Sequence, residues 1–231
     1  MKKVLLTLLT VAGLGVVANA QTNDAIKIGV KAGVTFPAFG ISGTETEGET
    51  FKTNTSFYIG GTVDFPISDM FSVQPGLSLI GKGGKQEYSE SANIGTSSYS
   101  VTATSKRSLM YLELPVNLVA KFAVGDGKLF VGAGPYYAMA ISGKDKESSV
   151  ETLAGVVSNE SSERDVKFGK NNDADMKRGD FGVNFLAGYQ INSGINIHAG
   201  YGLGLSNITN ESSSEFKATN KVFSVGLGYS F

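Results

Sequence analysis

The last ten residues, Val222-Phe223-Ser224-Val225-Gly226-Leu227-Gly228-Tyr229-Ser230-Phe231, show most clearly how this chain folds. Large apolar side chains alternate here with glycine and serine, so the two sets fall on opposite faces of an extended strand. One face carries Phe223, Val225, Leu227, Tyr229 and Phe231, and the other carries Ser224, Gly226, Gly228 and Ser230. A strand with lipid on one side and a narrow lumen on the other requires this alternation. The segment therefore predicts one strand of a transmembrane β-barrel.

Seven further windows of the sequence alternate with the same period of two, which marks strands with two different faces. They lie at about 26–36, 55–66, 71–82, 109–122, 129–141, 180–191 and 195–206. With the C-terminal segment they make eight strands. The sequence therefore predicts an all-β fold, an eight-stranded antiparallel up-and-down transmembrane β-barrel. After Gln21, no apolar run reaches the length of about 18 residues that a spanning helix needs.

The connections between these windows alternate between short turns and long polar stretches. The short turns, at 66–70, 123–128 and 192–194, contain Asp, Gly, Asn and Ser, which favour tight turns. The long stretches cover about 37–54, 83–108, 142–179 and 207–219. Outer-membrane barrels have short periplasmic turns and longer outer loops, so we expect four long extracellular loops. Tyr88, Tyr99 and Val101 lie in alternating polar stretches, which leaves open an extension of strands beyond the membrane.

The N-terminus is typical of an exported protein. Lys2 and Lys3 precede an apolar run from Val4 to Val17, and Ala18-Asn19-Ala20 is a small-residue cleavage site. We interpret residues 1–20 as a removed secretory signal and residues 21–231 as one outer-membrane β-barrel domain. Removing the two signal lysines leaves 18 basic against 21 acidic residues, a net charge of −3, so no basic surplus exists to bind nucleic acid. The chain has no cysteine and must fold without disulfides.

The same alternation predicts which residues fill the lumen. Where the apolar residues of a strand have odd numbers, the even-numbered residues point inward, and the reverse; we call this the parity rule. Thirteen glycines within the windows take the parity opposite the apolar residues, and only Gly61 and Gly81 do not, as expected if inward glycines make room for larger neighbours. The same parity places a polar cluster inside the barrel: Lys27, Lys31, Asp64, Lys82, Glu113, Asp180 and His198. Its three lysines and three carboxylates balance, which favours a paired, non-conducting plug over an ion pathway. We expect Lys27 and Asp64, near the same end of adjacent strands, to form an ion pair.

The sequence predicts no catalytic or metal site. His198, the only histidine, has inward parity and lies near a periplasmic turn, which suits a hydrogen-bonding lumen residue better than a general base. Asp173 and Asp175 offer oxygen ligands but lack the glycine and distal glutamate of a helix-loop-helix calcium site, so a solvated charge run is favoured. We expect no enzyme activity, no metal and no cofactor.

Four motifs carry a resemblance to a known family. They are Tyr111-Leu112-Glu113-Leu114-Pro115-Val116, Gly132-Ala133-Gly134-Pro135-Tyr136-Tyr137, Arg178-Gly179-Asp180-Phe181-Gly182-Val183 and Tyr201-Gly202-Leu203-Gly204-Leu205-Ser206-Asn207-Ile208. The set resembles the porin-like outer-membrane β-barrel family, which includes the type IX secretion component PorT and small OmpA- or OmpX-like barrels. The resemblance implies an eight-stranded barrel in the outer membrane and brings no catalytic residues. The alternating C-terminus with Tyr229 and Phe231 resembles the signal that the bacterial barrel-assembly machinery reads.

Two classes of function follow from the sequence, with a third less favoured. The first is a structural or surface-interaction barrel that displays its long loops on the cell surface. The second is a narrow pore, or an accessory protein of secretion or transport. A lipid-modifying enzyme is the third. The expected partners are outer-membrane lipid, the barrel-assembly machinery and a surface ligand or secretion partner that the sequence does not identify.

Overall fold

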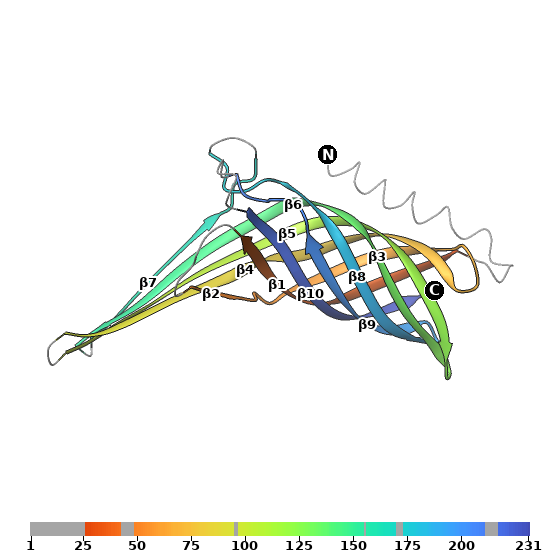
Figure 1. Ribbon diagram of the computed structural model, residues 1–231, viewed down its shortest axis with the longest axis horizontal. Helices are drawn as coiled ribbons and strands as arrows, with labels where there is room; N and C mark the ends of the chain where they lie inside the picture. Colours follow the sequence, from red (N-terminus) through yellow and green to blue (C-terminus); the bar gives the residue numbers. More distant parts are fainter. Residues whose placement is uncertain (1–25, 43–48, 95–96, 155, 170–172, 211–216) are drawn as a thin grey trace.

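The computed structural model describes residues 26–42, 49–94, 97–154, 156–169, 173–210 and 217–231 of the chain. In these ranges it has ten β-strands (Figure 1). They are β1 (Lys27–Ser42), β2 (Glu49–Lys52), β3 (Ser56–Pro66), β4 (Phe71–Ile94), β5 (Ser97–Val124), β6 (Gly127–Leu153), β7 (Val156–Asp165), β8 (Gly179–Ile191), β9 (Ile195–Gly204) and β10 (Lys217–Ser230). The signal predicted at 1–20 lies outside the described residues, so the division into a signal and a barrel domain at 21–231 stays a prediction.

Eight of these strands close into one antiparallel ring. Going around the ring, the order is β1, β3, β4, β5, β6, β8, β9 and β10. The ring closes where the first and last strands pair, from Gly29 opposite Ser230 to Ser42 opposite Lys217. β2 and β7 stand outside the ring, paired to β4 and β6 respectively. The predicted eight-stranded up-and-down barrel is confirmed. No helix in the described ranges is long and apolar enough to cross a membrane.

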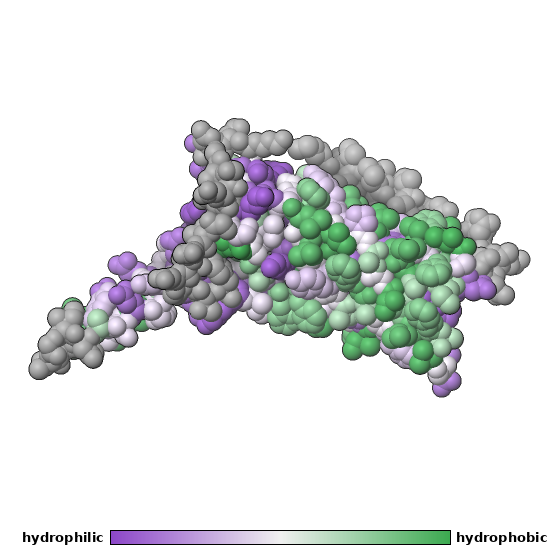
Figure 2. Space-filling model, in the orientation of Figure 1, coloured by the Kyte–Doolittle hydropathy of each residue, from purple (hydrophilic) through white to green (hydrophobic). Residues whose placement is uncertain are grey.

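The two faces of the barrel strands differ as the alternation predicts. On β5, Leu114, Val116 and Leu118 are 52%, 46% and 52% exposed. Glu113 and Asn117, which have the opposite parity on the same strand, are buried. Figure 2 shows apolar side chains gathered over the body of the barrel. So much exposed apolar surface would be unfavourable in water. The outer surface of the barrel therefore suits contact with lipid.

Three barrel strands, β4, β5 and β6, continue past the apolar surface and form a polar sheet with β7, which we call the extension (residues 85–94, 97–106, 144–153 and 156–165). It projects to the lower left in Figure 1. The loops predicted at 83–108 and 142–179 are therefore wrong over most of their length, because residues 83–94, 97–108, 142–153 and 156–165 are strand. Both faces of the extension contact water, so its sequence signal is only the weak alternation around Tyr88, Tyr99 and Val101, which lie in β4 and β5. We call this end of the barrel the long-hairpin end, and the opposite end the short-turn end.

A β-bulge where the extension begins changes which side chains face outward. Met110 lies opposite Ser142, whereas the next residue, Tyr111, lies opposite Ala140, so Ile141 is an extra residue in β6. Ala140 is buried inside the barrel, and beyond the bulge Asp145 is the buried side chain. The inward positions of β6 therefore change from even to odd numbers. The extension has an inner face continuous with the lumen and an outer face continuous with the lipid side.

Glycines inside the barrel lie against large rings, as the parity rule predicted. A Cβ atom on Gly33 would come within 2.8 Å of the Tyr58 ring, and one on Gly226 within 2.2 Å of its hydroxyl. On the other side of the lumen, a Cβ atom on Gly182 would lie 2.7 Å from the Tyr136 ring. These two tyrosines therefore occupy space that only a glycine leaves free, and both rings belong to the polar lumen described next.

Candidate functional site: a filled lumen and an apolar cap

Three of the predicted lumen residues meet in one ion cluster toward the long-hairpin end. The Lys82 ammonium (Nζ) lies 2.8 Å from Glu113 Oε2 and 3.0 Å from Asp180 Oδ2. The side chains of Lys82 and Asp180 are 2% and 0% exposed. Nζ also lies 4.1 Å from the centre of the Tyr136 ring, a cation–π contact. The cluster therefore joins β4, β5, β6 and β8 across the interior of the barrel.

Hydrogen bonds satisfy the two carboxylates of this cluster. Asp180 accepts a hydrogen bond of 3.2 Å from the Tyr136 hydroxyl, one of 2.9 Å from the Asn220 amide and one of 2.9 Å from the Ser206 hydroxyl. Glu113 accepts one of 3.1 Å from the Asn184 amide. Buried charges are tolerated only when they are paired and hydrogen-bonded, and both conditions are met here.

Lys31 and His198 lie beside the ion cluster. A cavity of about 120 Å³ adjoins it, lined among others by Lys31, Tyr58, Asn117, Glu113 and His198. His198 Nε2 lies 2.5 Å from the Tyr58 hydroxyl, and its Nδ1 lies 2.8 Å from Asn196 Oδ1. Lys31 and Lys82 balance Glu113 and Asp180, so the four charges around the cavity sum to zero. His198 thus lies inside the barrel, with both ring nitrogens engaged by neighbouring side chains.

Asp64 forms a second, separate polar group near the short-turn end. Its carboxylate receives a contact of 2.6 Å from Lys121 Nζ, and hydrogen bonds of 3.2 Å from Ser72 and 3.1 Å from Gln74. Lys27 is the cross-strand partner of Asp64, as predicted, but the predicted ion pair between them does not form within the described residues. Lys27 is exposed at the rim, where water solvates its ammonium group. Lys121 reaches Asp64 from two strands away because side chains in a narrow barrel converge on its axis.

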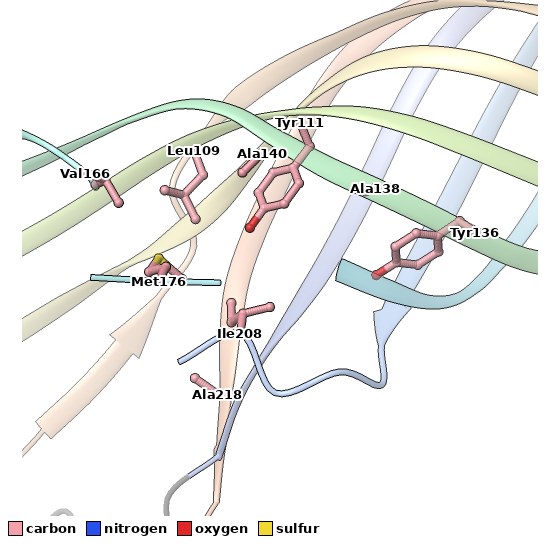
Figure 3. Close-up of a cluster of buried hydrophobic side chains, with 9 residues drawn as sticks. All are labelled: Leu109, Tyr111, Tyr136, Ala138, Ala140, Val166, Met176, Ile208 and Ala218. Carbon is pink, nitrogen blue, oxygen red and sulfur yellow. The ribbon is translucent and has the colours of Figure 1, made fainter. Parts of the chain in front are cut away.

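A cluster of buried apolar side chains, which we call the apolar cap, lies at the long-hairpin end of the barrel (Figure 3). Val166 and Met176, from the segment between β7 and β8, and Ile208, from the segment before β10, pack against Leu109 and Tyr111 of β5. Backbone hydrogen bonds fix the cap: the Lys177 amide donates to the Ile208 carbonyl, and the Ile208 amide donates to the Ala218 carbonyl. The sequence predicts polar outer loops at 142–179 and 207–219, so the cap departs from that prediction. The only signal for the cap was a few isolated apolar residues without periodicity.

A chain of alternating charges, which we call the clasp, ties the cap to the extension. Asp145 receives bidentate hydrogen bonds of 2.5 and 2.6 Å from Arg107 and one of 2.8 Å from Arg164. Arg164 also donates to Asp175, 2.8 Å away. Partial burial acts to raise the pKa of the Asp175 carboxyl, but hydrogen bonds from the Lys167 amide and from Arg164 outweigh it and hold the pKa below its usual value. Asp175 therefore serves the clasp, and no cluster of three potential metal ligands occurs among the described residues.

The C-terminal residues proposed as an assembly signal lie at the short-turn end of the outer surface. Phe231 is 70% exposed, and its ring meets the Tyr229 ring edge to face with centres 4.8 Å apart. The Phe231 amide donates a 2.8 Å hydrogen bond to the Ile28 carbonyl, so the last residue still pairs with the first strand. Both rings are therefore presented to the lipid side.

A closed ring of eight antiparallel strands, with an apolar outer surface and a polar interior, defines a transmembrane β-barrel of the bacterial outer membrane. The family model described as "Outer membrane protein beta-barrel domain" matches residues 19–210. The chain belongs to this family, and the predicted location in the outer membrane is confirmed. Its resemblance to the secretion component PorT stays a prediction.

Solved structures of small outer-membrane barrels are similar to the chain. OprG from Pseudomonas aeruginosa is 13% identical, with 92% of this chain and 99% of that chain covered and a TM-score of 0.46. Ail, the attachment invasion locus protein of Yersinia pestis, is 14% identical, with 89% and 98% covered and a TM-score of 0.38. Neisserial surface protein A is 11% identical, with 88% and 97% covered and a TM-score of 0.37. The comparison with curated proteins finds no match.

Proposed function

We propose that this protein is a non-conducting, non-enzymatic outer-membrane barrel that interacts with partners at the cell surface through its extension. The observation that carries the proposal is the ordered continuation of three barrel strands, joined by β7, beyond the apolar surface. From Leu109 to Ser97, β5 runs on for about 40 Å at roughly 3.3 Å per residue. Short turns face the periplasm in barrels of this kind, so the extension belongs outside the cell.

The lumen supports a surface role over transport. The Lys82 cluster, the Tyr58–His198 pair and the apolar cap occupy successive levels of the interior, which supports a lumen too filled to conduct. An eight-stranded barrel leaves little lumen free once side chains fill it. His198 has both nitrogens engaged inside the barrel, which supports a protein without catalytic activity.

The inner face of the extension is the surface we expect a partner to contact. Cross-strand register places Tyr88, Ala103, Ser149 and Glu160 side by side on this face. A shallow groove of about 460 Å³ lies over them. The exposed carboxylates on the face belong to Glu90, Glu147, Glu151 and Glu160. A face with several carboxylates and an exposed tyrosine suits a partner with basic or hydroxyl-rich groups.

A trimmed variant tests the proposal. Gln86 lies opposite Ser105 and Lys146 opposite Glu163, so residues 87–104 and 147–162 can each be replaced by Asn-Gly, a favoured two-residue hairpin turn. The barrel should still fold in detergent, while crosslinks formed by the full chain on intact cells should disappear. Crosslinks that persist in the trimmed variant would contradict the proposal. A measurable conductance of the full chain in planar bilayers would favour the narrow-pore alternative instead.

A further inference from the structure

We propose that a row of lysines on the outer face of the extension binds phosphate groups of the lipid headgroups that surround the barrel. Lys85, Lys106 and Lys146 are direct cross-strand partners on β4, β5 and β6. Like charges in directly opposite positions of a sheet repel one another. An anion shared by the row removes this repulsion.

The row lies on the lipid side of the molecule. On β5, the even-numbered residues Leu114, Val116 and Leu118 face outward, and Lys106 continues this series. Leu109 and Tyr111, the odd-numbered residues between, are buried. The row is therefore a continuation of the surface that contacts lipid.

The height of the row matches the headgroup layer. Lys106 lies four residues beyond Met110, and Lys146 lies five residues beyond the exposed Ile141. With about 3.3 Å per residue and strands tilted by about 45°, both ammonium groups lie about 10 Å above the apolar surface. The lipid phosphates lie in this interfacial layer, and long lysine side chains reach into it.

The acidic residues on the outer face leave the centre of the row uncompensated. Glu87 pairs with Lys52 and Lys85 at one edge, and Glu163 pairs with Lys144 at the other. Asp165 also lies on this face, opposite Lys144. Among the described residues, neither Lys106 nor Lys146 has a carboxylate within ion-pair distance. Lys106 therefore faces the headgroup layer without a protein counter-charge, and Lys146 has only Glu163, which lies opposite it in register and is already paired with Lys144.

Binding is measured with the full chain in neutral detergent, so the result does not depend on which end of the barrel faces outward in cells. The probe is diphosphorylated lipid A, which should raise the unfolding temperature of the wild type, whereas dephosphorylated lipid A should not. The double variant Lys106→Gln/Lys146→Gln should bind the phosphorylated probe about 30-fold more weakly, the equivalent of about 1 kcal/mol for each lysine near an anionic surface. Circular dichroism checks that the double variant is folded, which two exposed substitutions should not prevent.

A matched control is Lys128→Gln, which removes the same charge from an exposed lysine at the short-turn end. It should bind the probe as the wild type does. Equal binding by the double variant, or equal loss in the control, would overturn the proposal. A soluble polyanion such as dextran sulfate that binds the row while lipid A does not would overturn the lipid assignment.

Discussion

The Lys82 ammonium and the Asp180 carboxylate lie 3.0 Å apart inside the barrel, although 98 positions separate them in the sequence. This contact connects strands that are not neighbours in the ring, so it constrains the width of the barrel as well as its charge. Because Glu113 shares the same ammonium group, removing Lys82 leaves two buried carboxylates facing each other. The cluster is therefore the place where the interior is most sensitive to substitution.

Lys82→Met should lower the free energy of unfolding in detergent by about 3–5 kcal/mol, because it leaves uncompensated buried charge. Adding Asp180→Asn and Glu113→Gln should recover part of the loss, as expected for coupled sites. Lys85→Met, at a half-buried lysine three residues along the same strand whose partner Glu87 also pairs with Lys52, should change stability little. A conductance that opens in Lys82→Met without loss of stability would mean that the lumen is a gated channel.

Asp64 and Lys121 should behave as a coupled pair. Asp64→Ala should destabilise the barrel, and Lys121→Met should add little further loss in the double variant because its partner is already gone. Lys27→Met serves as the control, since it is opposite Asp64 in register but takes no part in the contact. Urea titrations of the four variants give the comparison. Strict additivity of Asp64 and Lys121 would show that the contact contributes nothing.

Deleting Phe231 should slow insertion into the outer membrane and send the chain to periplasmic degradation. The proposed reason is that the assembly machinery reads the exposed rings of Phe231 and Tyr229 at the end of the last strand. Pulse-labelling followed by membrane fractionation measures the yield. Phe231→Tyr should keep normal yield because it keeps the aromatic ring. Equal yield after deletion would refute this role.

Trypsin added to intact cells should cut the chain after Lys167. This residue is exposed and lies in the irregular segment between β7 and β8, whereas Lys144 and Lys146 lie within β6 and are protected by strand pairing. The fragments are identified by mass spectrometry, with Lys167→Gln as the uncut control. Cleavage only after the outer membrane has been breached would reverse the proposed orientation.

Acid should loosen the apolar cap through Asp175. The pKa of this carboxyl is lower in the folded protein than the ordinary value of about 3.9, so its stabilising effect is full above that value and is lost as the pH falls through the lowered pKa. Hydrogen exchange of the 166–169 backbone should therefore accelerate in that acid range. Asp175→Asn should exchange faster already at neutral pH and should lose this step. An unchanged profile in the variant would assign the effect to another group.

The barrel could be predicted from the sequence because lipid imposes a strict pattern on each spanning strand. Leu114 and Val116 must be apolar where they face lipid, so their alternation with Glu113 and Asn117 is visible in a single sequence. The extension has no such constraint, because both of its faces contact water and polar residues such as Ser, Thr and Glu are favourable on either face. The sequence therefore predicts loops over most of the region that the strands of the extension occupy.

The contacts inside the lumen could be predicted only in part. Parity places Lys82, Glu113 and Asp180 in the interior, and the structure brings the three together. Lys121 has the same inward parity as Glu113 but was left out of the predicted cluster. Which lysine reaches Asp64 depends on side-chain length and on access to water. The alternation of apolar and polar residues predicts neither. The cap residues Val166 and Met176 show no period at all.

The extra residue Ile141 decides which side chains of β6 face inward and which face outward in the extension. Deleting it would shift β6 by one position, so that Lys144 and Lys146 would turn inward and Asp145 would turn toward the lipid side. β7, which is paired to β6 along its whole length, would lose its register with the rest of the sheet or turn with it. The chemical character of each outer surface is thus encoded by the length of one strand as much as by its composition. Among related chains, the loss of one residue at this point would be enough to turn the lysines of β6 from the outer face to the inner face.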